Sequence, residues 1–118
     1  NSMFYGCESL TSLDLSHFNT SNVTNMVNMF GFCEALTSLN VSNFDTSNVV
    51  YLGGMFQSCT SITSLDLTSF DTNKVENMNA LFYLCTNLTE IKVSRDKWVD
   101  VSGTDKFWQC GTSTLTYV

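Results

Sequence analysis

The chain has 118 residues and a formal net charge of −6 at pH 7, and only 14% of its residues are charged. This length indicates one domain, and the acidic balance argues against nucleic acid as a partner, because nucleic-acid binding needs a basic surface. No apolar run approaches the roughly 18 residues of a membrane span, so we expect no membrane insertion of this segment.

The sequence repeats itself every 26 residues. The pattern M-F-x-x-C-x-x-L-T-S-L-x-L-S-x-F occupies residues 3–18, 29–44 and 55–70, and a looser copy begins at Leu81. A fixed period between about 20 and 50 residues is typical of stacked supersecondary units. We therefore expect about three and a half repeats in residues 1–93. Their units lie near residues 10–35, 36–61 and 62–87.

Each unit predicts a strand, a loop, a short helix and a turn, in that order. In the second unit, Leu39 and Val41 alternate with polar residues, which is the period of a strand. A loop follows, in which Phe44 is the only large apolar residue, and Ser47 then has the character of a helix N-cap. Apolar residues at spacings of three and four, typical of one helical face, come next. They are Val49, Leu52, Phe56 and Cys59.

These elements predict an α/β fold. Strands that recur with one helix between them should run parallel, with right-handed crossovers. The expected architecture is a right-handed β-α solenoid, with a parallel sheet on one face and short helices on the other. Gly53 and Gly54 fall inside the predicted helix that contains Val49 and Cys59, so we expect that helix to be short or irregular.

Residues 94–118 depart from the repeat. Cys110 follows Cys85 by 25 residues, and Trp108 stands 26 residues after Phe82, where the next Phe is expected. Leu115 and Tyr117 alternate like a last short strand. Terminal repeats are usually atypical, so we interpret 94–118 as a divergent last repeat or C-terminal cap. The chain opens in the middle of a unit, which suggests a fragment of a longer repeat array.

The repeat carries a family resemblance. L-x-x-L-x-L-x-x-F at residues 10–18, 36–44 and 62–70 resembles the leucine-rich repeat. The longer form, with F-D-T-S-N-V and M-F-x-x-C added, is similar to the 26-residue repeats of BspA-like bacterial surface proteins. The resemblance implies a leucine-rich-repeat-like solenoid in an extracellular protein of the bacterial cell surface. Some members of that family are adhesins for host matrix and plasma proteins, and the resemblance carries no catalytic residues.

The cysteines and one set of phenylalanines are expected to form structural ladders. Neighbouring cysteines in a ladder point the same way, which suits disulfide geometry poorly, and buried free cysteine behaves as a small hydrophobe. Disulfide bridges and a zinc site are the alternatives, although no CxxC pair is present. The ladder residues are Cys7, Cys33, Cys59, Cys85, Phe18, Phe44 and Phe70.

Carboxylates and amides recur on the outward side of the predicted sheet. Asp14, Asn40 and Asp66 share one strand position, while Asp45 and Asp71 share a loop position. Stacked carboxylates about 5 Å apart repel one another unless they are solvated, hydrogen-bonded or bridged by a cation. A calcium site would need six to eight oxygen ligands, so we favour the alternative, in which each Asp bonds its own turn and a helix N-terminus.

Exposed aromatic residues offer a second contact surface. Phe32 and Tyr51 fall opposite the predicted buried helix stripe, and Trp98 lies in the cap. No nucleophile elbow, zinc motif or phosphate loop is present, so we expect neither an enzyme nor a cofactor or metal site. The function expected is that of a surface interaction module of the adhesion type, with a protein or glycan ligand outside the cell. The alternative is a structural stalk or spacer without a ligand of its own.

Overall fold

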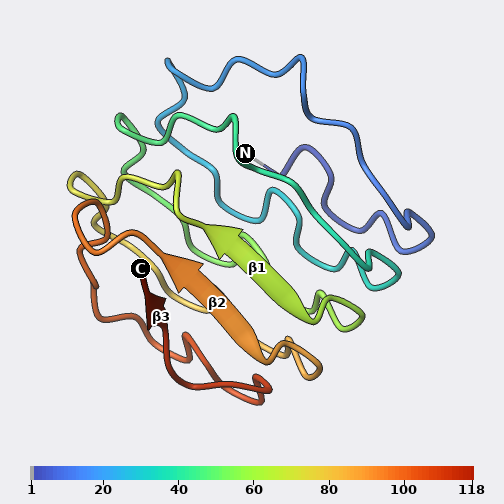
Figure 1. The fold of residues 1–118 in the computed structure, drawn as a ribbon. Helices are drawn as coiled ribbons and strands as arrows, with labels where there is room; N and C mark the ends of the chain where they lie inside the picture. Colours follow the sequence, from blue (N-terminus) through green and yellow to red (C-terminus); the bar gives the residue numbers. More distant parts are fainter. Residues whose placement is uncertain (1) are drawn as a thin grey trace.

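The computed structural model describes residues 2–118 and contains one small parallel sheet. Its strands are β1 (Ser64–Leu67), β2 (Glu90–Val93) and β3 (Thr116–Tyr117), in the order β1-β2-β3. Leu65 pairs with Ile91, and Val93 pairs with Tyr117. Figure 1 shows the chain passing back and forth in successive layers from the blue end to the red end, with each unit beside the previous one. Equivalent residues of adjacent units therefore become neighbours.

The expected fold class is wrong. Residues 2–118 contain no helix, and the only strands among them are the three short ones, so the predicted β-α solenoid with helices on one face is not formed. The stretches 10–15 and 36–41, which alternate like strands in the sequence, are irregular in the structure. Ser47, which has the sequence character of an N-cap, lies in a turn.

Left-handed backbone residues explain the absence of helices. Asn28, Gly54 and Ala80 have φ angles of 56°, 63° and 54°, and a second residue four positions later in each unit is also left-handed. A right-handed helix cannot pass through such residues. These later residues are Phe32, Ser58 and Leu84, with φ of 61°, 57° and 59°.

Consecutive tight turns replace each predicted helix. In the unit of residues 10–35, N–H groups donate to the carbonyl three residues back, from Met29 to Met26, from Gly31 to Asn28, and from Cys33 to Phe30. Successive turns of this size bring apolar side chains to one side at spacings of three and four. The helix-like spacing in the sequence is therefore a property of the turns.

The N–H groups between these turn bonds pair with the next unit. Phe30 N donates to Met55 O at 2.9 Å, and Phe56 N donates to Leu81 O at 3.1 Å. Tyr51 also forms isolated parallel bridges with Asn25 and Asn77. The backbone N–H and C=O groups of each turn segment therefore find hydrogen-bond partners partly within their own unit and partly in the neighbouring unit. Buried peptide groups require such partners.

Aromatic rings run through the core in a column. Phe4, Phe30, Phe56 and Phe82 stack at centroid distances of 5.6, 5.9 and 5.9 Å. The last three of these rings are fully buried. A second set continues beside them, in which Phe44 and Phe70 lie 6.4 Å apart. The predicted ladder Phe18, Phe44 and Phe70 belongs to this second set, and Phe18 is half-buried at its end.

The last unit enters the stack in a shifted register. Phe107, not Trp108, stacks on Phe82, at 5.5 Å, so the expectation that Trp108 takes the Phe position is wrong by one residue. The Thr72 hydroxyl donates to the carbonyl of Val99, just as the Thr46 hydroxyl donates to the carbonyl of Asp71, so Val99 takes the repeat position of Asp71. Trp98 therefore occupies the position of a core Phe. The last short strand expected near Tyr117 is present as β3.

Candidate contact surfaces

The outward positions of the sheet side bond their own backbone. Asp14, Asn40 and Asp66 are all exposed, and each side-chain oxygen accepts the N–H two residues further on. Hydrogen bonds from the side chains of Ser16 and Thr68, followed by those from their backbone N–H groups, hold the pKa of the Asp14 and Asp66 carboxyls below its ordinary value. The donors are Ser16, Ser42 and Thr68, each at 3.0 Å.

A shallow hollow on this side brings Asp14 and Asn40 together. Leu13, Ser16 and Ser42 also line it, whereas Asp66 lies outside. Its walls combine aliphatic atoms with small polar groups, and the side-chain oxygens of Asp14 and Asn40 already accept backbone N–H groups. The hollow can therefore admit a small polar group, but it offers no set of converging free ligands.

The loop carboxylates form a second row of such turns. Asp45 accepts the Ser47 N–H at 3.0 Å, and Asp71 accepts the Asn73 N–H at 3.0 Å. Hydrogen bonds from the side chain and backbone of Ser47 lower the pKa of Asp45. The expectation that each Asp bonds its own turn is confirmed, whereas the helix N-terminus expected beside it is absent.

A row of buried threonines joins the units, and sequence reasoning missed it. The Thr46 hydroxyl donates to Asp71 O at 2.9 Å and accepts Asp71 N–H at 2.8 Å. Thr20 makes the same pair of bonds to Asp45. The available signal was the identity of the residue, because Thr recurs at this position in three consecutive units while the residues on either side of it vary. The row consists of Thr20, Thr46 and Thr72.

The cysteines lie in a row with their thiols free. Cys33, Cys59 and Cys85 are buried, and each Sγ donates to the carbonyl of a Phe in the preceding unit at 2.9–3.2 Å. Burial raises the pKa of these thiols, to about 12 for Cys85. Cys7 and Cys110, at the two ends of the row, are half-buried. The buried thiols are therefore protonated and hydrogen-bonded at neutral pH.

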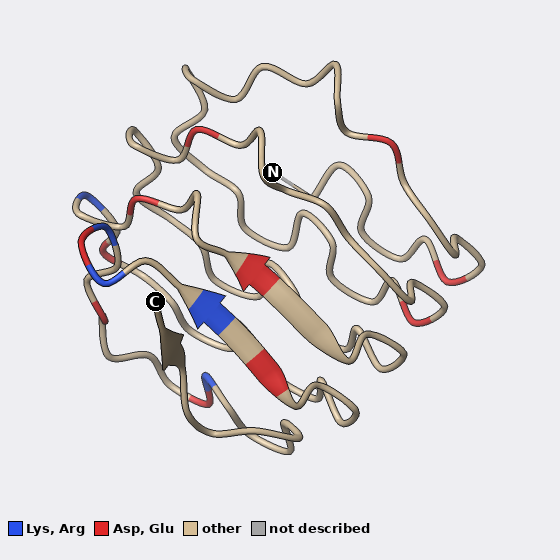
Figure 2. Cartoon of the chain, viewed as in Figure 1, with Lys and Arg blue, Asp and Glu red and all other residues tan. Residues whose placement is uncertain are grey.

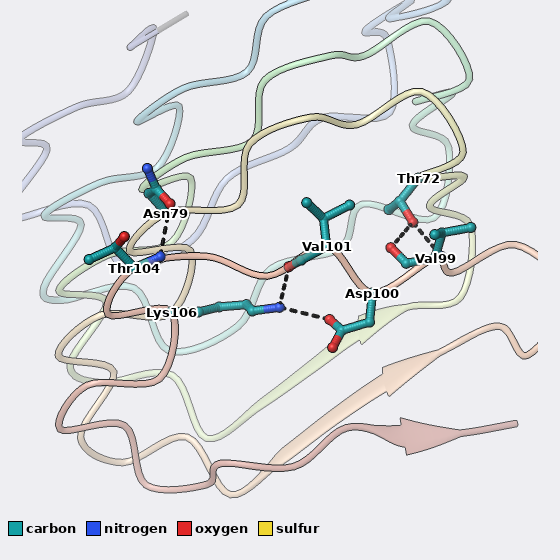
Figure 3. Close-up of polar contacts among 7 residues, drawn as sticks. All are labelled: Thr72, Asn79, Val99, Asp100, Val101, Thr104 and Lys106. Carbon is teal, nitrogen blue, oxygen red and sulfur yellow. Dashed lines mark hydrogen bonds and ion pairs between the residues drawn. The ribbon is translucent and has the colours of Figure 1, made fainter.

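An ion pair closes the last unit. Lys106 is only 7% exposed, and its Nζ donates to Asp100 Oδ1 at 2.7 Å and to Val101 O at 2.6 Å (Figure 3). The backbone register places Asp100 at the repeat position that Thr72 holds in the preceding unit. The hydrogen bonds between Thr72 and Val99 appear in the same figure. A charged pair thus replaces the threonine link of the earlier units.

The predicted aromatic surface is only partly formed. Tyr51 is 44% exposed, while Phe32 is half-buried with its ring 5.3 Å from that of Tyr5. Trp98 is 6% exposed, which contradicts its expected place among the exposed aromatics. Trp108 is 46% exposed instead, because the register of the last unit is shifted by one residue.

Neither charge nor metal-binding groups define a site. The Lys and Arg residues, blue in Figure 2, all lie in the later half of the sequence, between residues 74 and 106, where acidic residues are interspersed with them. Among residues 2–118, no group of three or more His, Cys, Asp or Glu side chains is placed to hold a metal ion. No helix in this part of the chain could cross a membrane.

The comparisons with known proteins identify a family. Residues 1–111 match the family described as "Mycoplasma protein of unknown function, DUF285". The chain belongs to this family. No curated protein and no solved structure matches it. The family description names no activity, so a function has to be argued from the surfaces of this member.

In this member of the family, most polar side chains of the repeat already have internal partners. The carboxylates of Asp45 and Asp66 accept bonds from their own turns, and the hydroxyl of Thr46 and the thiol of Cys59 bond neighbouring units. Exposed aromatic rings remain, and about half of the surface of each is open to solvent. They include Tyr5 and Trp108 on turn segments and Tyr51 at the isolated bridges.

Proposed function

We propose that this chain is a non-enzymatic interaction module of a bacterial cell-surface protein, which binds a protein or glycan outside the cell. The observation that carries the proposal is the exposure of Tyr5, Tyr51 and Trp108, at 50%, 44% and 46%, in a molecule whose polar groups are largely paired internally. Aromatic side chains dominate the binding energy of protein interfaces. The same rings also suit stacking against sugars.

Two features support a binding role over a catalytic one. The thiols of Cys59 and Cys85 are buried and have raised pKa values, so they are poor nucleophiles. Asp14 lines the shallow hollow and Asp66 lies outside it, and hydrogen bonds within their own turns lower the pKa of both carboxyls. These carboxylates are therefore poorly suited to proton transfer near neutral pH.

A structural stalk is the second candidate, and the rows of Phe, Thr and Cys favour it. Each row runs through adjacent units and fixes their spacing, as in the Phe30–Phe56–Phe82 stack. Such a stack would hold another domain at a distance without binding anything itself.

A binding experiment separates these candidates. The purified 118-residue chain is immobilised and tested against matrix proteins, plasma proteins and glycans. The turn-face variant carries Tyr5→Ser, Tyr51→Ser and Trp108→Ser, which remove the three exposed rings. The sheet-face variant carries Ser38→Arg and Ser64→Arg at two exposed positions. Both variants are checked for an unchanged melting temperature before use.

The variants give distinct outcomes. Saturable binding that is lost in the turn-face variant and kept in the sheet-face variant supports the proposal and its surface. The reverse result moves the site to the sheet side. No binding to any member of the panel, even when the chain is displayed in many copies, contradicts the module and favours the stalk, since avidity raises weak affinities strongly.

A further inference from the structure

Three side chains stand in a row at the isolated bridges. Tyr51 forms a parallel bridge with Asn25 of the preceding unit and another with Asn77 of the following unit. Chains paired in this way lie about 5 Å apart, so an amide side chain stands on each side of the tyrosine. Because complete units flank Tyr51 on both sides, its 44% exposure is a property of the lateral surface of the repeat.

The two asparagines of this row have a structural role that the tyrosine lacks. The Oδ1 of Asn25 and that of Asn77 each accept the N–H two residues further on, at 2.9 Å. Tyr51 cannot make this bond, and the equivalent N–H, that of Gly53, has no acceptor among residues 2–118. An N–H without a partner lowers stability, so the fold does not explain the tyrosine. Such departures from a local rule are expected at functional sites.

Gly53 leaves the surface beside the tyrosine without a side chain. Its φ is not positive, so its own backbone conformation does not require glycine. The close approach of neighbouring atoms does, because a Cβ there would lie 3.0 Å from Asn77 Oδ1 and 3.3 Å from Asn79 O. The unpaired N–H of Gly53 is therefore two residues from the exposed ring and has no side chain of its own to cover it.

The free polar groups of the row are hydrogen-bond donors. Each asparagine Oδ1 is occupied by an N–H, and neither the Asn25 Nδ2 nor the Asn77 Nδ2 has a partner among residues 2–118. Aromatic hot spots of protein interfaces are surrounded by contacts that exclude water, whereas this ring has a polar amide on each side. An exposed ring between free donors suits a ligand that has one apolar face and several oxygens.

We propose that Tyr51, with Asn25, Asn77 and the Gly53 N–H, binds a neutral sugar ring; this rests on the interaction module proposed above and names its ligand at this position. The C–H groups on one face of a pyranose carry partial positive charge and pack against the negative face of an aromatic ring. The sugar hydroxyl oxygens would accept from the two amides and the N–H. The net charge of −6 disfavours acidic sugars.

NMR titration of the isotope-labelled 118-residue chain tests the proposal. The probes are the methyl glycosides of glucose, galactose, mannose and N-acetylglucosamine, and methyl glucuronide is the acidic counterpart. We expect at least one neutral glycoside to shift the backbone signal of Gly53 and the side-chain amide signals of Asn25 and Asn77 in a saturable way. The glucuronide should bind more weakly than that glycoside.

Tyr51→Asn completes the row of asparagines and separates a binding role from a packing role. Its new Oδ1 would accept the Gly53 N–H, as the neighbouring asparagines do for their turns, so the melting temperature should not fall. Sugar affinity should fall at least about tenfold, as is common when a central aromatic contact is removed. Tyr51→Phe keeps the stacking face and should keep most of the affinity. Tyr117→Asn is the matched control, because Tyr117 is 43% exposed but lies on β3.

Asn77→Asp removes only a donor. The carboxylate still accepts the N–H two residues further on, as Asp45 and Asp66 do in their own turns, so the fold should be kept. Sugar affinity should fall about three- to tenfold, which corresponds to one hydrogen bond. Unchanged affinity in this variant would remove the amide from the site and overturn the proposal.

Three other results overturn it as well. They are the absence of binding by every neutral glycoside or tighter binding of the glucuronide, sugar binding that survives Tyr51→Asn, and a Tyr51→Asn variant that melts well below the wild type. In each case the interaction module itself stands if the panel of matrix proteins, plasma proteins and glycans still contains a ligand. The module fails only when that panel gives no binding.

Discussion

Replacing the buried Thr46 tests how the units are joined. Its hydroxyl makes two hydrogen bonds of 2.8–2.9 Å to the backbone of Asp71, and the side chain is 1% exposed. Thr46→Val keeps the shape but leaves the Asp71 N–H and carbonyl without their partner. A buried polar group left unpaired costs about 1–3 kcal/mol, and Asp71 is half-buried, so we expect a loss of about 2 kcal/mol.

The matched variant is Thr46→Ser, which keeps the hydroxyl and removes one methyl group. Burial of one such carbon contributes about 0.8 kcal/mol, so this variant should lose about 1 kcal/mol. Urea unfolding followed by circular dichroism measures both. With a slope of about 1–3 kcal/mol per molar urea, the two midpoints should differ measurably. A serine variant less stable than the valine variant would refute the reasoning, because apolar contact would then outweigh the hydrogen bonds.

Three further predictions concern the backbone, the carboxylates and the thiols. Ala80→Gly should raise the free energy of unfolding by about 0.5–1 kcal/mol, because a left-handed conformation costs about 1–2 kcal/mol and the entropy of glycine offsets part of that gain. Ala35→Gly, at a position without positive φ, should lower it by about 0.5–1 kcal/mol, and thermal unfolding compares the two. The lowered pKa of Asp45 stabilises the fold above its unfolded pKa of about 4, and this contribution is lost as the pH falls through the folded pKa. Asp45→Asn should keep the turn and remove that pH dependence of the melting temperature, whereas Asp45→Ala should melt lower at neutral pH as well. Cys59 and Cys85 should resist a thiol reagent at pH 8 in the native protein and react at once in denaturant, and rapid native labelling of either would contradict their burial.

The sequence predicts the repeat and its register, and the structure shows why the helices were predicted wrongly. Spacings of three and four suit a helix, but they also arise when turns of four residues follow one another. The deciding feature is the left-handed φ of Asn28, Ala80 and Leu84, and only Asn among these residue types suggests such a conformation. Gly54 was a second sign, because glycine adopts a positive φ readily, and its φ here is 63°.

The sequence also predicted part of the candidate surfaces correctly and misplaced one residue of them. Asp14 and Asn40 do lie together on the sheet side, because the repeat period alone places them in adjacent units. Trp98 was misplaced because residues 94–98 contain two more residues than the equivalent segment of the preceding unit. That shift is visible only from the bond between Thr72 and Val99. The link made by Thr46 was missed because a threonine between polar neighbours resembles an ordinary loop residue.

The contacts between units also bear on the rate of folding. Nearly every link joins residues about 26 positions apart, as Phe30 joins Phe56 and Thr46 joins Asp71. The entropy lost on closing a loop depends on its length, which here is the same for every junction. Once one pair of units has formed, each further unit closes a loop of that same size against a surface already in place. The slow event is therefore the first pairing, and lengthening the array should leave its time scale nearly unchanged.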